Sequence, residues 1–184
     1  NTLTAGADFL NDYLTTYQFT DNTSHTQNSY DAFAQFDYNP LEWLNIVASL
    51  RHDYFSASSQ NATTGRLALM TKWKGFSIRA NYAGGFRAPT LKEMYMSFDM
   101  AGMQMIYGNP DLEPEKSNNF NLALEHTGRI KSAGFLTGQY SLTLMGYYNK
   151  YDKRITTEDY EDYQPGEGQP DVASRYCNED GVKV

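Results

Sequence analysis

Few residues in this sequence of 184 are spaced for chemistry, and those few favour ligand binding over catalysis. The guanidinium of Arg87 could hold a carboxylate through two parallel hydrogen bonds, which suits an anionic ligand. The sequence contains no Ser/His/Asp arrangement, no glycine loop for phosphate and no HExxH helix. The single cysteine, Cys177, excludes an intrachain disulfide and leaves no Cys/His spacing for zinc. We therefore expect no enzymatic activity and no metal site, and the role of Cys177 stays open.

The elements that must position such residues are β-strands, because apolar residues recur at every second position in segment after segment. Residues 76–86 show this best: Phe76 and Ile78 fall on one face, whereas Ser77 and Arg79 fall on the other. The same alternation predicts about seven strands and no helix. The predicted strands cover residues 3–18, 29–38, 44–53, 64–74, 76–86, 118–126 and 139–155.

The connections between these strands alternate between short and long, which is typical of an outer-membrane β-barrel. Tight turns are expected at residues 39–42 and 74–75, and longer polar stretches at residues 19–28, 56–63 and 87–117. Alternation alone does not separate a watery barrel lumen from the outer face of a soluble β-sandwich. Aromatic residues near the strand ends favour the barrel, because membrane barrels carry aromatic girdles at both interfaces. These residues are Tyr30, Tyr38, Trp43, Tyr54, Trp73, Tyr82 and Tyr148.

Composition excludes other classes of protein. The formal net charge is −7 and the basic residues are scattered, so we expect no nucleic-acid partner. No apolar run approaches the roughly 18 to 20 residues of a transmembrane helix, and no stretch resembles a signal peptide. A membrane β-barrel remains compatible, because each of its strands needs only about 9 to 11 residues.

The predicted strands are too few for the lumen that their polar face implies, since large outer-membrane transporters have about 22 strands. We therefore expect an all-β fold that is a fragment of a larger antiparallel, up-and-down transmembrane β-barrel. Residues 1–156 would form barrel strands and loops, with an outer loop at residues 87–117. Residues 157–184 would form a further outer loop, poorly ordered unless something holds it.

Two short boxes within residues 85–95 and 108–117 resemble the paired FRAP and NPDL boxes of TonB-dependent receptors. As in that family, the boxes bracket a predicted outer loop between two strands, and the ordered pair is far more specific than FRAP alone. Pro89 also ends ladder pairing and Pro110 stiffens a turn, so we expect the boxes mainly to place the loop. The boxes comprise Phe86, Arg87, Ala88 and Pro89, and Asn109, Pro110, Asp111 and Leu112.

This resemblance implies a receptor in the outer membrane of a Gram-negative bacterium that binds a scarce metal complex and takes it up actively. Its partners would be outer-membrane lipid, the ligand, and the TonB–ExbB–ExbD energy-coupling complex. That complex would act through a plug, which we expect to lie outside these residues. The family catalyses no reaction and implies no intrinsic cofactor, so haem or another iron complex would be present only as the transported ligand.

The segment between the boxes resembles that of haem receptors, notably the haemin-uptake type of Bacteroidetes. Many haem receptors carry an iron-ligating histidine in this segment, and this sequence has none there. A thioether or a phenolate is also an axial haem ligand, although the methionines could instead pack the loop against the barrel. The candidate ligand-binding residues are Arg87, Tyr95, Met100, Met103 and Tyr107, together with His25 from another predicted loop.

Two alternatives to haem or iron uptake stay open. The first is a receptor of the same family for cobalamin, a siderophore or a glycan. The second belongs to another class, a soluble β-sandwich that acts as an interaction module.

Overall fold

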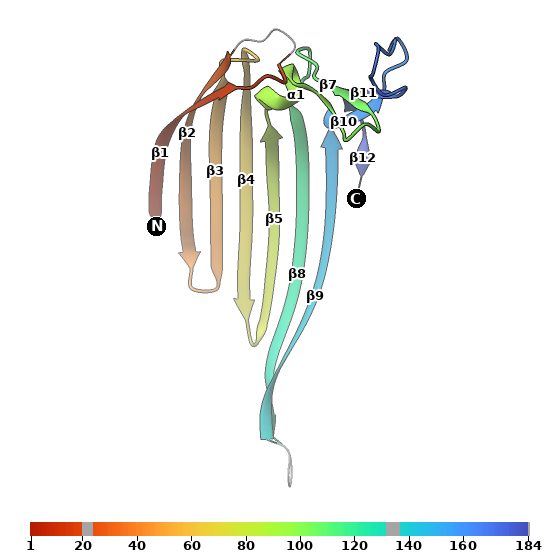
Figure 1. Cartoon of the computed structure of the whole chain (residues 1–184). Helices are drawn as coiled ribbons and strands as arrows, with labels where there is room; N and C mark the ends of the chain where they lie inside the picture. The colour runs from red at the N-terminus through yellow and green to blue at the C-terminus, as the bar shows by residue number, and fades with distance from the viewer. Residues whose placement is uncertain (20–23, 132–136, 184) are drawn as a thin grey trace.

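The computed structural model describes residues 1–19, 24–131 and 137–183, and these residues form two β-sheets and a short helix (Figure 1). The large sheet consists, in spatial order, of β1 (Thr2–Thr15), β2 (Ser24–Leu41), β3 (Leu44–Phe55), β4 (Gln60–Trp73), β5 (Phe76–Arg87), β8 (Glu115–Lys131), β9 (Thr137–Asp152) and β12 (Val182–Lys183). The small sheet consists, in spatial order, of β10 (Arg154–Asp159), β11 (Ala173–Glu179), β7 (Met105–Tyr107) and β6 (Ser97–Asp99).

One face of the large sheet is apolar, as the alternating pattern predicts. Its neighbouring strands are all antiparallel, and the register places Ile46, Leu69, Ala80 and Leu122 side by side across β3, β4, β5 and β8. Side chains on this face are largely uncovered, and Leu122 is 57% exposed. An apolar sheet face of this kind must be covered by another apolar medium, and hydrocarbon is that medium in a membrane barrel.

The opposite face of the large sheet carries charged and amide side chains that pair with one another. The guanidinium of Arg51 on β3 lies 3.1 Å from the Asp31 carboxylate of β2 and 2.8 Å from that of Asp53. Arg79 on β5 pairs with Glu125 on β8 at 3.2 Å. Asp53 is only 8% exposed, so this carboxylate depends on its ion pair. The charged groups of this face are therefore held in ion pairs along and between the strands.

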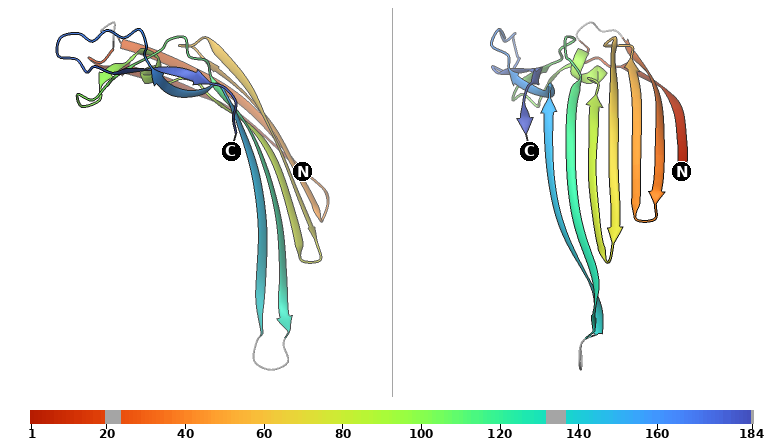
Figure 2. Two further views of the ribbon diagram at one scale, coloured as in Figure 1. Left: turned by 90° about the vertical axis from the view of Figure 1, so that its right-hand side faces the viewer. Right: turned by 180° about the vertical axis from the view of Figure 1, so that it is seen from behind.

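Tight turns join the strands at one end of the large sheet. The turn between β4 and β5 lies at Lys74 and Gly75, as predicted, and both residues have positive φ, 47° and 88°. The predicted turn at residues 39–42 was misplaced, because β2 continues to Leu41 with a register irregularity that contains Pro40. Proline has no backbone N–H to donate, so it is tolerated at such an irregularity. The β8–β9 hairpin extends beyond its neighbours at this end (Figure 2).

The other end of the long strands carries a small packed unit, which we call the cap. The cap comprises the helix α1 (Leu91–Tyr95), the four strands of the small sheet and the segments that join them (Figures 1 and 2). Most of the buried apolar side chains of the described chain lie in the cap or against it. They are Phe19, Leu91, Met94, Met96, Ile106, Leu112, Ile155 and Ala173.

The cap corrects several expectations. No helix and no strand were predicted within residues 87–117, where α1, β6 and β7 are found. The predicted strand 139–155 ends at Asp152, because Lys153 has a φ of 56° and the chain turns there into β10. β11, within the predicted loop 157–184, pairs in parallel with β7, so that Ser174 lies opposite Ile106. In the described parts of the chain, no helix is both long and apolar enough to cross a membrane.

Candidate functional site

Arg87 of the first box, the last residue of β5, joins α1 to the start of β8. Nη1 of Arg87 donates to both carboxylate oxygens of Glu93 in α1, each at 3.0 Å. Nη2 lies 3.5 Å from Glu115 Oε2, at the start of β8, and Arg87 and Glu115 are also opposite each other in the strand register. Two carboxylates therefore neutralise the guanidinium that sequence analysis offered to an anionic ligand.

Glu93 also fixes the start of α1. The backbone N–H of Glu93 donates to the Thr90 hydroxyl at 3.2 Å, and Glu93 Oε2 accepts from the backbone N–H of Thr90 at 2.8 Å. This reciprocal pair is a capping box, which satisfies N–H groups that a helix terminus leaves without partners. Pro89, directly before Thr90, is fully buried, and its ring fixes the backbone φ angle. Both features restrict the conformation of the chain between β5 and α1.

Asn109 of the second box links α1 to β11. Its backbone N–H donates to the Glu93 carbonyl at 2.9 Å, and its side-chain Nδ2 donates to the Tyr176 carbonyl at 2.9 Å. Its Oδ1 accepts from Arg175 Nη2 at 3.1 Å and from the backbone N–H of Asp111 at 3.0 Å. The asparagine amide thus ties together segments that are more than sixty residues apart in the sequence.

Glu113, the residue after the second box, contacts the connection between β9 and β10 at Lys153 and also contacts β11 at Asn178. Asn178 Nδ2 donates to the carbonyls of Glu113 and Lys153, both at 2.9 Å. The Lys153 ammonium lies 3.1 Å from Glu113 Oε1 and 3.9 Å from Asp180 Oδ2. The hydrogen bond to Glu113 and the nearby Asp180 carboxylate raise the pKa of Lys153, so the ammonium stays charged.

The remaining box residues pack or turn the chain. Leu112 is fully buried, whereas Pro110 and Asp111 are exposed and Ala88 is half-buried. The Phe86 ring lies 5.6 Å from that of Phe55. The structure therefore places the boxes as the framework of the cap, in line with the interpretation that they position the loop.

Gly108, directly before the second box, sits against α1. A Cβ at this position would lie 2.7 Å from the carbonyl carbon and oxygen of Met94. Because that contact is with backbone, no side-chain rotation would relieve it. The close approach of the two segments therefore requires glycine.

The candidate residues Met100 and Met103 lie in the turn between β6 and β7. The backbone N–H of Met103 donates to the Met100 carbonyl at 3.1 Å, and Met100 pairs with Gln104 at 2.9 Å. The two side chains are 48% and 68% exposed, whereas Met94 and Met96 of the same segment are buried. The thioethers of the turn therefore face outward, and the cap core is packed by the other two methionines.

Tyr107 belongs to a separate aromatic cluster. Its ring centroid lies 5.6 Å from that of Tyr160 and 5.9 Å from that of Tyr163. The Arg175 guanidinium lies over the Tyr160 ring at 5.8 Å. Burial raises the pKa of Tyr163, and the neighbouring Tyr107 and Asp171 act in the same direction, so its phenol stays protonated at neutral pH.

His25 and Tyr95 form a third group. Their rings stack at 3.9 Å between centroids with an interplanar angle of 2°, and the Phe19 ring meets His25 edge-on at 4.6 Å. His25 lies in β2, within the residues that sequence analysis assigned to a loop. This contact attaches α1 to the first strands of the large sheet, so both residues help to hold the cap.

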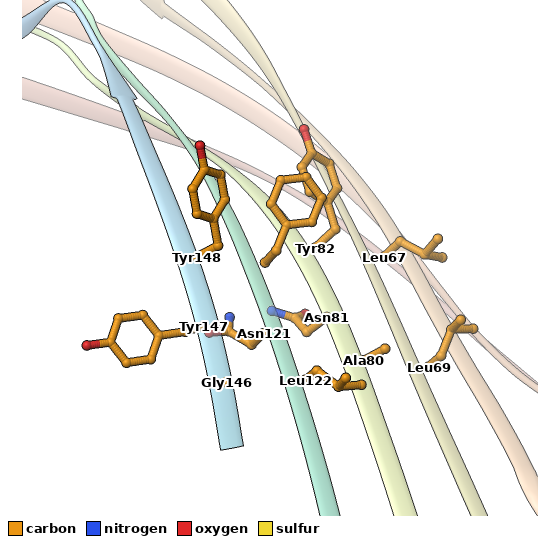
Figure 3. A pocket seen from close by; sticks show the side chains of 11 residues that line it. Leu67, Leu69, Ala80, Asn81, Tyr82, Asn121, Leu122, Gly146, Tyr147 and Tyr148 are labelled. Atoms are coloured by element: carbon orange, nitrogen blue, oxygen red, sulfur yellow. The ribbon is translucent and has the colours of Figure 1, made fainter. Parts of the chain in front are cut away.

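A shallow groove of about 530 Å³ lies on the apolar face of the large sheet, away from the cap. Figure 3 shows its lining, with Tyr82 and Tyr148 above and Leu122 below. Gly146 of β9, which has no side chain, also lines the groove. Its walls offer rings and alkyl groups without charge, as expected for a surface against lipid. In the described residues no group of three or more His, Cys, Asp or Glu side chains could hold a metal ion.

Sequence analysis missed the acceptors and donors that tie the boxes to the rest of the cap. The role of Glu93 could have been predicted, because Thr90 followed by Glu93 fits the S/T-x-x-E capping pattern. No sequence pattern indicates the roles of Glu115, Arg175 and Asn178, because their partners lie in segments far away in the sequence.

Comparison with known proteins gives the family of the chain. All residues, 1–184, match the family model described as TonB dependent receptor-like, beta-barrel. Over 82 residues, 44% of this chain, the sequence is 33% identical to the iron-regulated outer membrane virulence protein of Vibrio cholerae. That match covers 11% of the Vibrio protein.

Solved structures show the same fold. The siderophore receptor PirA of Pseudomonas aeruginosa superposes with a TM-score of 0.83 at 18% identity, over 98% of this chain and 34% of PirA. The hemophore receptor HasR of Serratia marcescens, a double mutant in complex with its hemophore HasA and heme, superposes with a TM-score of 0.72 at 14% identity. That superposition covers 98% of this chain and 36% of HasR. The chain thus spans about a third of these receptors.

These matches confirm the predicted all-β, antiparallel barrel fragment and decide against the soluble β-sandwich. They also agree with a sheet whose described strands do not close on themselves, since β1 and β12 stand at opposite edges. The chain belongs to the family of TonB-dependent receptor-like β-barrels.

Proposed function

We propose that this chain is part of an outer-membrane receptor that takes up an iron complex, with haem as its ligand. In this proposal the large sheet is a section of the barrel wall in the outer membrane of a Gram-negative bacterium. The cap lies on the outer side, because outer-membrane barrels have short turns on the periplasmic side and long loops outside. The TonB–ExbB–ExbD complex supplies the energy for transport through a plug beyond these residues.

The observation that carries the proposal is the pair of exposed thioethers on a hydrogen-bonded turn of the cap. Met100 and Met103 are 48% and 68% exposed, and the turn that bears them is built on β6 and β7 of the cap. Thioether sulfur is a soft ligand that is found at the axial position of haem iron. A haem that arrives from the outer side would meet these groups without any rearrangement of the cap core.

The relatives support an iron complex as the class of ligand. The Vibrio relative is described as iron-regulated, PirA as a siderophore receptor, and HasR was solved with its hemophore and heme. At 18% and 14% identity, the structural matches do not decide between these ligands, so the choice of haem rests on Met100 and Met103.

The test is a titration of the detergent-solubilised receptor with haemin, followed by Soret absorbance. We expect saturable binding in the parent and a dissociation constant about tenfold weaker in the Met100→Ala/Met103→Ala variant, as for the loss of roughly 1.4 kcal/mol of binding energy. Met145→Ala is the matched control, because Met145 is 74% exposed and lies on β9, outside the cap.

Each outcome of this titration has a clear meaning. Unchanged binding in the double variant would contradict thioether ligation and move attention to Tyr107 in its aromatic cluster and to the His25–Tyr95 stack. No Soret change in the parent would exclude haem. A parallel titration with ferric enterobactin then tests the siderophore alternative.

A further inference from the structure

The apolar groove on the large sheet adjoins a second cavity of about 370 Å³, which lies nearer the cap. Tyr82 lines both spaces, and its hydroxyl donates to Asn118 Oδ1 at 2.9 Å. Lys116 and Asn118 of the second cavity alternate along β8 with the same period as Phe120 of the groove. Their side chains therefore lie on the same face of the sheet, and the two cavities share the wall at Tyr82.

The groove owes its shape to small residues beside larger ones. In the row that crosses β5, β8 and β9, Ala80 lies opposite Leu122, and Leu122 lies opposite Gly146. A Cβ at Gly146 would have no atom within 4 Å, so the space above this strand is open. The next row toward the cap is aromatic, with the rings of Tyr82 and Phe120 4.9 Å apart. A chain of CH₂ groups suits such a space, because it contacts alkyl and aromatic carbon and loses no hydrogen bond.

The second cavity is polar and its lining carries a positive charge. The ladder between β4 and β5 ends before this point, and Gly65 and Gly84 add no side chains there. Among the described residues of the lining, Lys116 alone is charged. Asn118 Oδ1 already accepts from Tyr82, so this amide offers its N–H groups to a ligand. An ammonium group and an amide donor together suit the oxygens of a phosphate.

The charges next to the cavity keep this positive balance. Asp152, which lies opposite Lys116 in the strand register, is held by Lys150 at 2.9 Å. Within the described residues no ion pair engages Lys116 itself. Two ammonium groups and one carboxylate give this part of the face a net charge of +1. An anionic group is therefore attracted to Lys116.

Lys116 also lies at the height of a lipid headgroup. Lys116 and His126 are ten residues apart on β8, which corresponds to about 33 Å along a strand at about 3.3 Å per residue. Strands of outer-membrane barrels tilt by about 35 to 45°, so the rise across the bilayer is about 25 Å, the height of the apolar band. His126 contacts the Phe76 ring at 4.2 Å between centroids, near the tight turns. Lys116 therefore lies at the opposite border of the band, next to the cap.

We propose that the groove and the second cavity together bind one membrane lipid that carries a negatively charged phosphate group. An acyl chain of the lipid lies in the groove beside Leu122 and Gly146. The phosphate accepts hydrogen bonds from Lys116 and Asn118, and Tyr82 lies between the two parts of the site. The proposal rests on the placement of the large sheet in the membrane, which is part of the proposed function, and it does not depend on haem.

The test compares two lipids with the same acyl chains, dipalmitoylphosphatidylglycerol, which carries a phosphate, and dipalmitoylglycerol, which does not. Each lipid is titrated into the detergent-solubilised receptor, and native mass spectrometry measures the bound fraction. We expect saturable binding of the phosphatidylglycerol, about fivefold tighter than that of dipalmitoylglycerol. Lys116→Gln should abolish this difference, because one basic side chain at a membrane surface has an effect of this size. Lys72→Gln is the matched control, because Lys72 lies opposite Ser77, on the other face of the sheet.

Gly146→Leu tests the groove. The leucine fills the open space above β9 without adding a charge, so both lipids should bind about tenfold more weakly, as for the loss of about two buried CH₂ groups. Gly138→Leu is the control, because Gly138 lies on the same face of β9 but does not line the groove. A Cβ at Gly138 would likewise have no atom within 4 Å.

The proposal is overturned if the two lipids bind equally well, or if Lys116→Gln or Gly146→Leu binds them as the parent does. Displacement of the phosphatidylglycerol by an equal concentration of glycerol 3-phosphate would also overturn it, because the site would then recognise a free phosphate compound without acyl chains. Haemin titration of the same sample reports separately on the proposed uptake function.

Discussion

The carboxylate of Glu93 holds the guanidinium of Arg87 at 3.0 Å from both of its oxygens, and so joins the end of β5 to the first turn of α1. The same carboxylate accepts the backbone N–H of Thr90 at 2.8 Å. Glu93 is 15% exposed at its side chain, so these bonds are partly shielded from water. One residue therefore fixes both the box arginine and the helix that follows it.

Replacing Glu93 with alanine should loosen the cap without unfolding the sheet. The variant loses the capping box and leaves Arg87 with Glu115 alone, at a cost of about 1 to 2 kcal/mol for local opening. Hydrogen exchange of α1 should accelerate about fivefold to thirtyfold, and exchange in β3 and β4 should stay unchanged. Glu42→Ala, in the exposed turn after β2, is the control. Equal acceleration throughout the chain would contradict this role.

Gly108→Ala should also destabilise the cap. The added Cβ would lie 2.7 Å from the backbone of Met94, so α1 and the second box must move apart, at a cost of about 1 to 3 kcal/mol. Limited proteolysis within the cap is the measurement. Gly146→Ala provides the comparison, because no atom lies within 4 Å of a Cβ at Gly146. The same protease resistance in both variants would show that the approach at Gly108 is not needed.

The alternating strands of the large sheet were predictable, because a single short-range pattern specifies both the strand and its faces. The alternation of Phe76, Ser77, Ile78 and Arg79 on β5 is an example, and the register bears it out. The cap was not predictable in this way. Its strands are short, and β11 pairs with β7 across more than sixty residues, as Ser174 does with Ile106. Such pairing leaves no local period in the sequence.

The candidate site likewise has a part that could be predicted from the sequence and a part that could not. The first box lies at the end of β5 and the second box lies before β8, and this placement could be predicted from the sequence. The neutralisation of the Arg87 guanidinium could not be predicted in this way, because Glu115 reaches it through strand pairing. The exposure of Met103 could not be derived either, since methionines of the same segment, such as Met94, are buried in the cap core.

Leu122→Arg should impair folding in lipid, whereas Asn121→Arg should be tolerated. The two residues are adjacent on β8, so they point to opposite faces, and Leu122 lies in the apolar row with Ala80. An arginine on the lipid face of a barrel costs about 2 to 4 kcal/mol near the middle of the bilayer. Urea titration of the receptor in lipid vesicles measures the difference. If Asn121→Arg were the more damaging change, the assignment of the two faces would be reversed.

Cys177 should react slowly with thiol reagents at neutral pH. Burial raises the pKa of its thiol, and the Glu158 carboxylate on β10 raises this pKa further, so less of the reactive thiolate is present at a given pH than for a free cysteine. The alkylation rate should therefore climb about tenfold per pH unit and keep rising beyond the pH at which free cysteine levels off. Glu158→Gln removes the nearby charge, lowers the pKa of the thiol and should speed alkylation at pH 7.5, whereas Asp159→Asn, at the next position on β10, should not. Iodoacetamide kinetics on the folded protein test both statements. A rate as high as that of free cysteine at pH 7.5, with no response to Glu158→Gln, would mean that the thiol is neither buried nor influenced by Glu158.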